Sequence, residues 1–178
     1  MNNMNGIIDL IKTRQSCRSF SGERVPKEKL SSILEAAILS PSARNSQPWD
    51  LTLAASDDAV LSVGECTRAG GKNKFTEKCS AFIVITERDC EDAFGGAKHR
   101  YFAEMDIGMC VMNMCLQAEA LGVASCILGA FDSEKLRSVV NAPDNCEIKL
   151  VVALGYAEDG YPVREKTRRS FDSVVKII

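Results

Sequence analysis

The sequence lacks long hydrophobic runs and a recognisable targeting segment. Its apolar runs are short, such as Phe82–Ile85, whereas a membrane-spanning helix needs about 20 consecutive apolar residues. At the N-terminus, no Lys or Arg precedes the short apolar stretch within Met1–Ile11, and Asp9 interrupts that stretch, so it does not resemble a signal peptide. The sequence therefore predicts a cytoplasmic protein with no membrane contact.

The sequence also lacks an excess of charge of either sign. Lys and Arg number 22 against 24 Asp and Glu, which gives a net charge of −2. Bulk attraction to nucleic acid or to an anionic membrane is not expected from this balance. The length of 178 residues, with 46% hydrophobic and 26% charged residues, is typical of one globular domain, here residues 1–178.

Histidine is nearly absent, and the common nucleotide motifs are missing. His99 is the only histidine, so a Cys-His nucleophile or a histidine acid/base pair would depend on one residue. No GxGxxG or GxxxxGK[ST] motif occurs, which argues against the usual Rossmann and P-loop sites. None of the eight cysteines forms a CxxC pair, so we expect no metal site and no disulfide framework. Buried thiols that act as small hydrophobic residues are the expected alternative.

The periodicity of apolar residues predicts a mixture of helices and strands. Ranges of about 7–15, 26–40, 57–67, 100–121 and 132–140 are expected as helices, and 49–55, 81–86, 125–128 and 147–156 as strands. Asp57 and Asp58 are expected to cap the third helix, and residues 170–178 to form a strand or an arm. Because no regular βαβ alternation occurs, we expect an α+β fold with a mixed sheet.

The helix over 100–121 is unusually apolar. Between Met105 and Leu116 only Asp106 and Asn113 are polar, and their spacing of seven residues places them on one face, with Gln117 one turn further on. Such a narrow polar stripe is typical of a helix buried on nearly all sides. It could be a central core helix, or it could lie between the core and a partner chain.

Two basic clusters occupy opposite ends of the chain. Arg14 and Arg18 follow a short helix, with Ser16 between them, and their guanidinium groups could reach one anion. Either cluster alone is typical of a solvated surface, but two in a nearly neutral chain favour convergence on one anionic ligand. The second cluster consists of Arg164, Lys166, Arg168 and Arg169.

The segment 41–49 reads PSARNSQPW and carries several polar groups between two prolines. The prolines restrict the backbone, while Ser42, Asn45 and Gln47 offer hydroxyl and amide groups. Such a loop suits the polar edge of a planar heterocycle. Alternatively, it is a helix-to-strand turn whose side chains satisfy its own backbone.

Together these motifs resemble the nitroreductase family of FMN-dependent oxidoreductases. The resemblance covers nearly the whole chain and keeps the family's order of segments. It implies an α+β nitroreductase-like fold with a central mixed or antiparallel sheet flanked by helices, in an intertwined homodimer with FMN at the subunit interface. The matching segments are 14–18, 41–49, 106–122, 126–131 and 166–168.

The resemblance also implies a role for each matching residue. The basic residues and Ser16 would hold the phosphate and ribityl groups, and Arg18 would lie near N1 and O2 of the flavin. Gln15 stands where the family often has a second basic residue. Pro41, Ser42 and Asn45 would come from the second subunit, and the N–H of Gly129 would donate to flavin N5. The implied cofactor-binding set is Arg14, Gln15, Ser16, Arg18, Pro41, Ser42, Asn45, Gln47, Asn73, Leu128, Gly129, Lys166 and Arg168.

The activity implied by the resemblance belongs to the cofactor. FMN would pass hydride from NADH or NADPH through N5 to an acceptor such as a nitroaromatic or a quinone, in a ping-pong scheme. No catalytic side chain is needed, which fits a chain with one histidine. The alternatives are a non-enzymatic flavin-binding or redox-sensing module, a relative with another flavin reaction such as dehalogenation or flavin fragmentation, and a structural domain.

Overall fold

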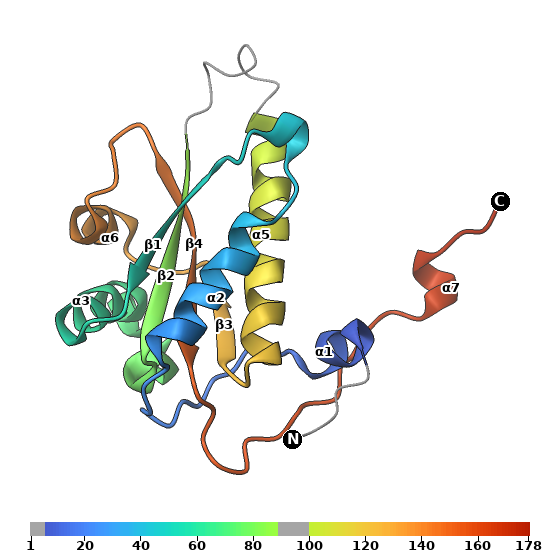
Figure 1. Cartoon of the computed structure of the whole chain (residues 1–178), viewed down its shortest axis with the longest axis horizontal. Coiled ribbons are helices and arrows are strands. Elements are labelled where there is room, and N and C mark those ends of the chain that lie inside the picture. The colour runs from blue at the N-terminus through green and yellow to red at the C-terminus, as the bar shows by residue number, and fades with distance from the viewer. Residues whose placement is uncertain (1–5, 89–99) are drawn as a thin grey trace.

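A computed structural model describes residues 6–88 and 100–178 (Figure 1). Residues 89–99, which include Cys90 and His99, lie outside these ranges. The helices are α1 (Ile7–Thr13), α2 (Lys27–Ile38), α3 (Asp57–Arg68), α5 (Arg100–Ala120), α6 (Ser133–Val140) and α7 (Phe171–Val174), with 3-10 helices η1 (Ala43–Asn45), η2 (Ala69–Gly71) and η3 (Lys74–Lys78). The strands are β1 (Trp49–Ala54), β2 (Ala81–Glu87), β3 (Ala124–Leu128) and β4 (Glu147–Gly155).

The four strands form one sheet in the order β1-β2-β4-β3, and every neighbouring pair is antiparallel. Strands β2 and β3, which α5 connects, run in the same direction. Strand β4 lies between them and separates them, so the sheet is antiparallel where the sequence pattern favoured a mixed one. A single isolated parallel bridge, Ser16 to Ser125, is found in the described part of the chain. The α+β class is confirmed.

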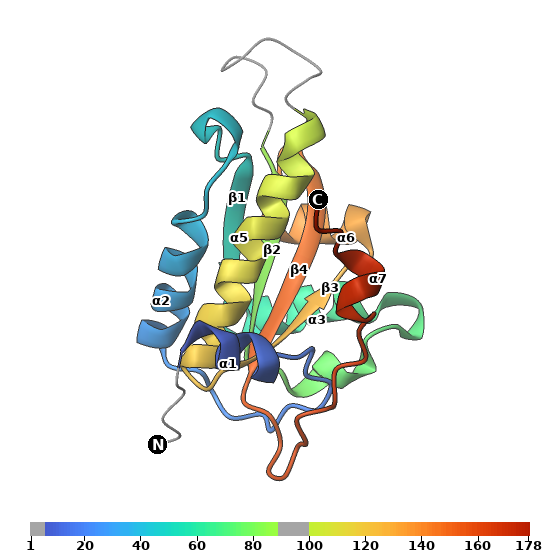
Figure 2. The same ribbon diagram turned by 90° about the vertical axis from the view of Figure 1, so that its right-hand side faces the viewer.

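Helices cover both faces of the sheet. In β2, Ile83 and Ile85 belong to the core that includes α2 and α5, whereas Phe82 and Val84 belong to the core that includes α3 and α6. This division follows from the alternation of side chains along a strand. Figure 1 shows α2 and α5 on one side of the sheet and α3 and α6 on the other, and Figure 2 shows the same layers from the side of α5.

Helix α5 is buried on one side only in the single chain. Its inward face, which includes Ile107 and Met114, packs in the core. Its other face carries large apolar side chains at spacings of three and four residues, and these are two-fifths to one-half exposed. They are Phe102 (45%), Met105 (51%), Met109 (39%) and Met112 (39%). We refer to these four residues as the α5 stripe.

Both ends of the chain leave the body of the molecule. Helix α1 exposes Ile7, Ile8 and Ile11. The residues after 162 run outward to α7, which stands apart from the sheet and its helices in Figure 1. Of the two structures expected for 170–178, the arm is confirmed and the strand is wrong, because four residues form a helical turn and the rest pair with no strand among the described residues.

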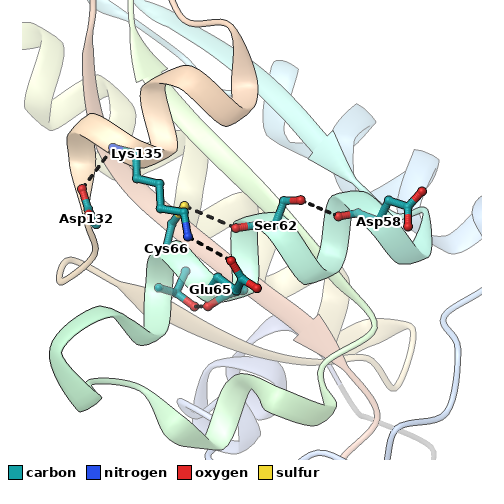
Figure 3. Close-up of polar contacts among 8 residues, drawn as sticks. Asp58, Ser62, Glu65, Cys66, Asp132 and Lys135 are labelled. Atoms are coloured by element: carbon teal, nitrogen blue, oxygen red, sulfur yellow. Dashed lines mark hydrogen bonds and ion pairs between the residues drawn. The ribbon is translucent and has the colours of Figure 1, made fainter.

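Helices α3 and α6 contact each other through polar groups as well as apolar ones (Figure 3). Lys135 Nζ lies 2.9 Å from Glu65 Oε2, and Asp132 caps α6 by accepting from Lys135 N. The cap of α3 is Ser56, whose side chain accepts from Ala59 N. Asp57 and Asp58 occupy the first turn instead, where their charges favour the helix dipole.

The cysteines fill the core. All seven described cysteines are free and buried, which confirms their expected role for this part of the chain. Burial raises the pKa of the Cys79 and Cys110 thiols to about 12, so neither is a thiolate near neutral pH. No helix among residues 6–88 and 100–178 has the length and apolar character needed to cross a bilayer.

Lys149 joins three carboxylates at one end of the sheet. Its Nζ lies 2.9 Å from Glu87, 3.2 Å from Glu104 and 2.8 Å from Glu147, and its side chain is 16% exposed. Burial alone lowers the pKa of Lys149, but hydrogen bonds to Glu147, Glu87 and Glu104 outweigh burial and raise that pKa well above 10.5. The charged form is therefore favoured in the folded protein.

We expect Lys149 to stabilise the fold up to about pH 10.5 and to lose this effect above it. A raised pKa in the folded state contributes stability below the unfolded pKa, and this contribution disappears as the pH rises through the folded pKa. The free energy of unfolding in urea, measured at pH 8, 10 and 11, should fall more steeply above pH 10.5 in the wild type than in Lys149→Met. Lys135→Met is the matched control, because its ion pair is half-exposed. If the free energy of unfolding falls equally steeply above pH 10.5 in the wild type and in Lys149→Met, Lys149 does not have this role.

Candidate functional site

The first basic cluster lies on an extended segment. Helix α1 ends at Thr13, two residues before the predicted end, and the chain then pairs beside β3, where Cys17 N donates to Ser125 O at 2.9 Å. Alternate residues of an extended segment share a side. Arg14, Ser16 and Arg18 thus lie on one side by the strand period rather than by helical spacing, while Cys17 is buried.

The segment 161–168 is hydrogen-bonded along the first cluster. Gln15 Nε2 donates to Pro162 O at 2.8 Å, and Gln15 Oε1 accepts from Arg164 N and Nε. Arg164 Nη2 also donates to Ser16 O at 2.6 Å. Gln15 therefore joins the two ends of the chain through both the nitrogen and the oxygen of its side-chain amide.

Lys166 completes this arrangement. Its Nζ donates to Arg14 O at 2.7 Å. Partial burial, followed by the positive charges of Arg14 and Arg168, lowers the pKa of Lys166 below its ordinary value. Positive charge thus accumulates where the two ends meet, and an anion would relieve the repulsion.

We call this meeting point the basic pocket. It has a volume of about 290 Å³ and combines five cationic side chains with Ser16. Arginine forks and a lysine suit a phosphate group, whose oxygens accept charge-assisted hydrogen bonds. The lining residues are Arg14, Gln15, Ser16, Arg18, Arg164, Glu165, Lys166, Thr167 and Arg168.

Asn73 contacts the chain just beyond the end of β3, one residue after Gly129. Asn73, in the left-handed region at φ 42°, uses its Nδ2 group to donate to Thr67 O and Ala130 O at 3.0 and 2.8 Å. A ring contact from Asn73 would therefore go through its Oδ1. Among described residues, no atom lies within 4 Å of the place where a Gly129 side chain would be, whereas Leu128 is buried. Gly129 is thus exposed, with open space on the side where a side chain would be.

The loop 41–47 bonds largely within itself. Ser42 Oγ accepts from Gln47 N at 2.9 Å, and Gln47 Nε2 lies 3.3 Å from Asn45 Oδ1. Arg44, Asn45 and Gln47 all have positive φ, at 54°, 57° and 46°. Non-glycine residues in this region carry backbone strain, and such residues cluster at functional sites. Both interpretations of this loop thus find support.

One chain does not bring this loop to the basic pocket. The loop contacts the start of α5, where Ala43 N donates to Asp106, and the pocket adjoins the segment beside β3, which follows the end of α5. Asp106 and Ala120 are 14 positions apart along the helix, which corresponds to about 21 Å. Figure 1 shows η1 and α1 beside opposite ends of α5. Pro41, Ser42, Asn45 and Gln47 are therefore separated from Arg14, Ser16, Arg18, Lys166 and Arg168.

Two residues at or beside the pocket are not among those expected from the sequence. Arg164, a member of the second basic cluster, lines the pocket. Tyr161 lies beside it, and its Oη accepts from Arg18 N at 3.0 Å. Membership of the cluster was the available signal for Arg164. Arg169, from the same cluster, instead donates to Ser173 O in the arm.

The chain is similar in sequence to members of one known protein family. The sequence profile of the nitroreductase family matches residues 11–62 and 58–156. A protein of Archaeoglobus fulgidus, named as an NADH dehydrogenase/NAD(P)H nitroreductase, is 31% identical over 163 residues that cover 88% of each chain. The iodotyrosine dehalogenase 1 homolog of Caenorhabditis elegans is 21% identical over 94% of this chain and 59% of its own.

Solved structures share the fold. A crystal structure of an oxidoreductase containing FMN superposes with a TM-score of 0.71 at 29% identity, over 84% of this chain and 76% of that chain. A nitroreductase of Bacteroides fragilis with bound FMN superposes with a TM-score of 0.77 at 22% identity, over 98% and 99% of the two chains. With the profile match and the relative at 31% identity, these findings show that the chain belongs to the nitroreductase family.

Proposed function

We propose that the protein is an FMN-dependent oxidoreductase that takes hydride from NADH or NADPH and passes it to a small electron acceptor. The observation that carries this proposal is the basic pocket, where five cationic side chains from both ends of the chain suit one phosphate. We further propose that residues 1–178 form one FMN-binding domain and that the protein is cytoplasmic.

The residues of the pocket suit the parts of FMN. Arg14, Lys166 and Arg168 would hold the phosphate with Ser16, and Arg164 adds a charge to this group. Arg18 would place positive charge at the pyrimidine edge of the ring, where it favours the more negative, reduced cofactor. The backbone N–H of Gly129, which is an exposed residue, would donate to the ring. Bound FMN supplies the two-electron hydride chemistry, and the side chains orient it.

We propose that the site is shared between two copies of the chain. The α5 stripe supports this, because apolar side chains at spacings of three and four residues suit packing against a second helix. Two α5 helices packed antiparallel would place the start of one beside the end of the other. Loop 41–47 of one subunit would then approach the basic pocket of its partner, which is the contact that a single chain does not make.

The arms are also expected to pack on the second copy. The exposed apolar residues of α1 and of the C-terminal arm, among them Ile7, Phe171 and Ile178, lie on segments that project from the body. Buried against a partner, they would add apolar contact area to the α5 stripe. This accounts for their exposure in the single chain.

The decisive experiment is anaerobic stopped-flow mixing of the FMN-loaded protein with NADH and with NADPH. We expect the flavin absorbance near 450 nm to bleach with at least one of them and to return after a nitroaromatic or quinone is added. Bound flavin that neither donor bleaches would overturn the reductase proposal and would favour a flavin-binding module. A halogenated aromatic substrate should be tested in the same assay, because a dehalogenase homolog is among the relatives.

A further inference from the structure

The three polar residues noted on α5, Asp106, Asn113 and Gln117, all form hydrogen bonds within the chain. Gln117 Nε2 donates to Ser32 Oγ of α2 at 3.0 Å, and Asn113 Nδ2 donates to Ser40 Oγ, just after α2, at 2.8 Å. Ser40 is buried. The narrow polar face seen in the sequence therefore fixes α2 and the start of the following loop along α5.

Asp106 forms the last contact of this series, and it reaches the loop itself. Its carboxylate is 2% exposed, and its Oδ2 accepts from Ala43 N, the first amide of η1, at 3.0 Å. Burying a carboxylate costs free energy unless the carboxylate is hydrogen-bonded, so breaking the contact with Ala43 N would be unfavourable. The residues that follow Ala43 are the strained Arg44 and Asn45, whose positive φ needs support from the surroundings.

Asp106 also lies next to the α5 stripe in sequence. Met105 precedes Asp106 by one residue and Met109 follows it by three. Both methionines point outward, whereas Asp106 points inward. One rigid helix thus presents a face to a second copy of the chain and holds the loop that would approach that copy's pocket. The position of the loop is thereby fixed relative to the subunit interface.

We propose that Asp106 is a positioning residue for FMN binding: through its hydrogen bond to Ala43 N it holds loop 41–47 in the conformation that contacts the cofactor of the partner subunit. This inference rests on the proposed function. It assigns Asp106 no contact with FMN, and its effect passes through the single hydrogen bond to Ala43.

The test removes this hydrogen bond from either side. Asp106→Ala removes the acceptor. Ala43→Pro removes the donor, and proline suits the first position of η1 after Ser42, whose backbone is extended. Gln117→Ala is the matched control, because it removes a contact of the same helix that does not reach the loop. FMN affinity is measured by fluorescence titration, and folding by thermal unfolding without FMN.

We expect Asp106→Ala and Ala43→Pro each to weaken FMN binding about tenfold, and the double variant to bind no more weakly than the weaker single one. Asp106→Asn keeps an acceptor for Ala43 N and should bind FMN within about threefold of the wild type. Gln117→Ala should bind like the wild type.

Several outcomes would overturn the inference. If Asp106→Ala binds FMN as tightly as the wild type, the inference is wrong. It is also wrong if Gln117→Ala loses as much FMN affinity as Asp106→Ala, because that result would indicate a general loosening of α5. Additive losses in the double variant would mean that the two residues act separately. If Asp106→Ala does not fold, Ala43→Pro and Asp106→Asn decide the question. A wild type that binds no FMN defeats the proposed function instead.

Discussion

Replacing Met109 with glutamate is expected to yield monomers of 19.4 kDa and to weaken FMN binding by at least about a hundredfold. Met109 lies within the α5 stripe, and a two-fold axis would place two new carboxylates near each other in an apolar contact. Burying unpaired charges costs more than such a contact contributes. Because the proposed shared site takes loop 41–47 from the partner, loss of the dimer should also remove part of each FMN site.

Light scattering gives the mass of the protein, and fluorescence titration gives the FMN affinity. Leu61→Glu is the matched control, since Leu61 is 58% exposed on α3, on the opposite side of the sheet from α5. The control should remain dimeric and bind FMN like the wild type. A wild-type protein that is monomeric while FMN stays bound would contradict the shared site directly.

Replacing Arg14 or Arg168 with alanine is expected to cost about 1–3 kcal/mol of FMN binding free energy, or roughly 5- to 150-fold in affinity. Each variant loses charge-assisted hydrogen bonds to a phosphate. The basic pocket would be left with four cationic side chains in place of five. The remaining affinity should also depend less steeply on salt, because fewer charges attract the anion.

Riboflavin, which has no phosphate, separates this effect from general damage to the site. Its affinity should be similar in the wild type and in both variants, so the preference for FMN over riboflavin should shrink. Arg169→Ala is the control within the same cluster, because Arg169 bonds to Ser173 in the arm. Unchanged FMN affinity in Arg14→Ala and Arg168→Ala would refute the phosphate assignment.

Much of the fold could be predicted from local patterns. The alternating or continuous apolar residues of 81–86 and 147–156 indicated strands, and helical spacing indicated α2, α5 and α6. These patterns are informative because burial of one or both faces of an element determines the spacing of its apolar residues along the sequence. The end of α1 was predicted less well. Ile7, Ile8 and Ile11 show a helical period, but Arg14 gives no stop signal, and pairing with Ser125 overrides the local preference.

The candidate site was only partly predictable. The two basic clusters could be identified, but their contacts join residues about 150 positions apart, such as Gln15 and Arg164, and no local pattern reports such a pairing. The two sides of α5 were also ambiguous. Met105 and Met114 have the same chemistry, yet one is half-exposed and the other fully buried. Only packing against the sheet distinguishes them.

The basic pocket combines residues from opposite ends of the sequence, and this has a consequence for biosynthesis. Lys166 meets Arg14 across a separation of 152 residues, so the basic pocket closes one of the largest loops in the chain. Three of its five cations, Arg164, Lys166 and Arg168, are translated about 150 residues after Arg14. A nascent chain on the ribosome lacks most of the charge that would hold a phosphate. Under the proposed function, FMN is therefore held only by chains that have been synthesised beyond Arg168, and chains truncated before Arg164 would not retain it.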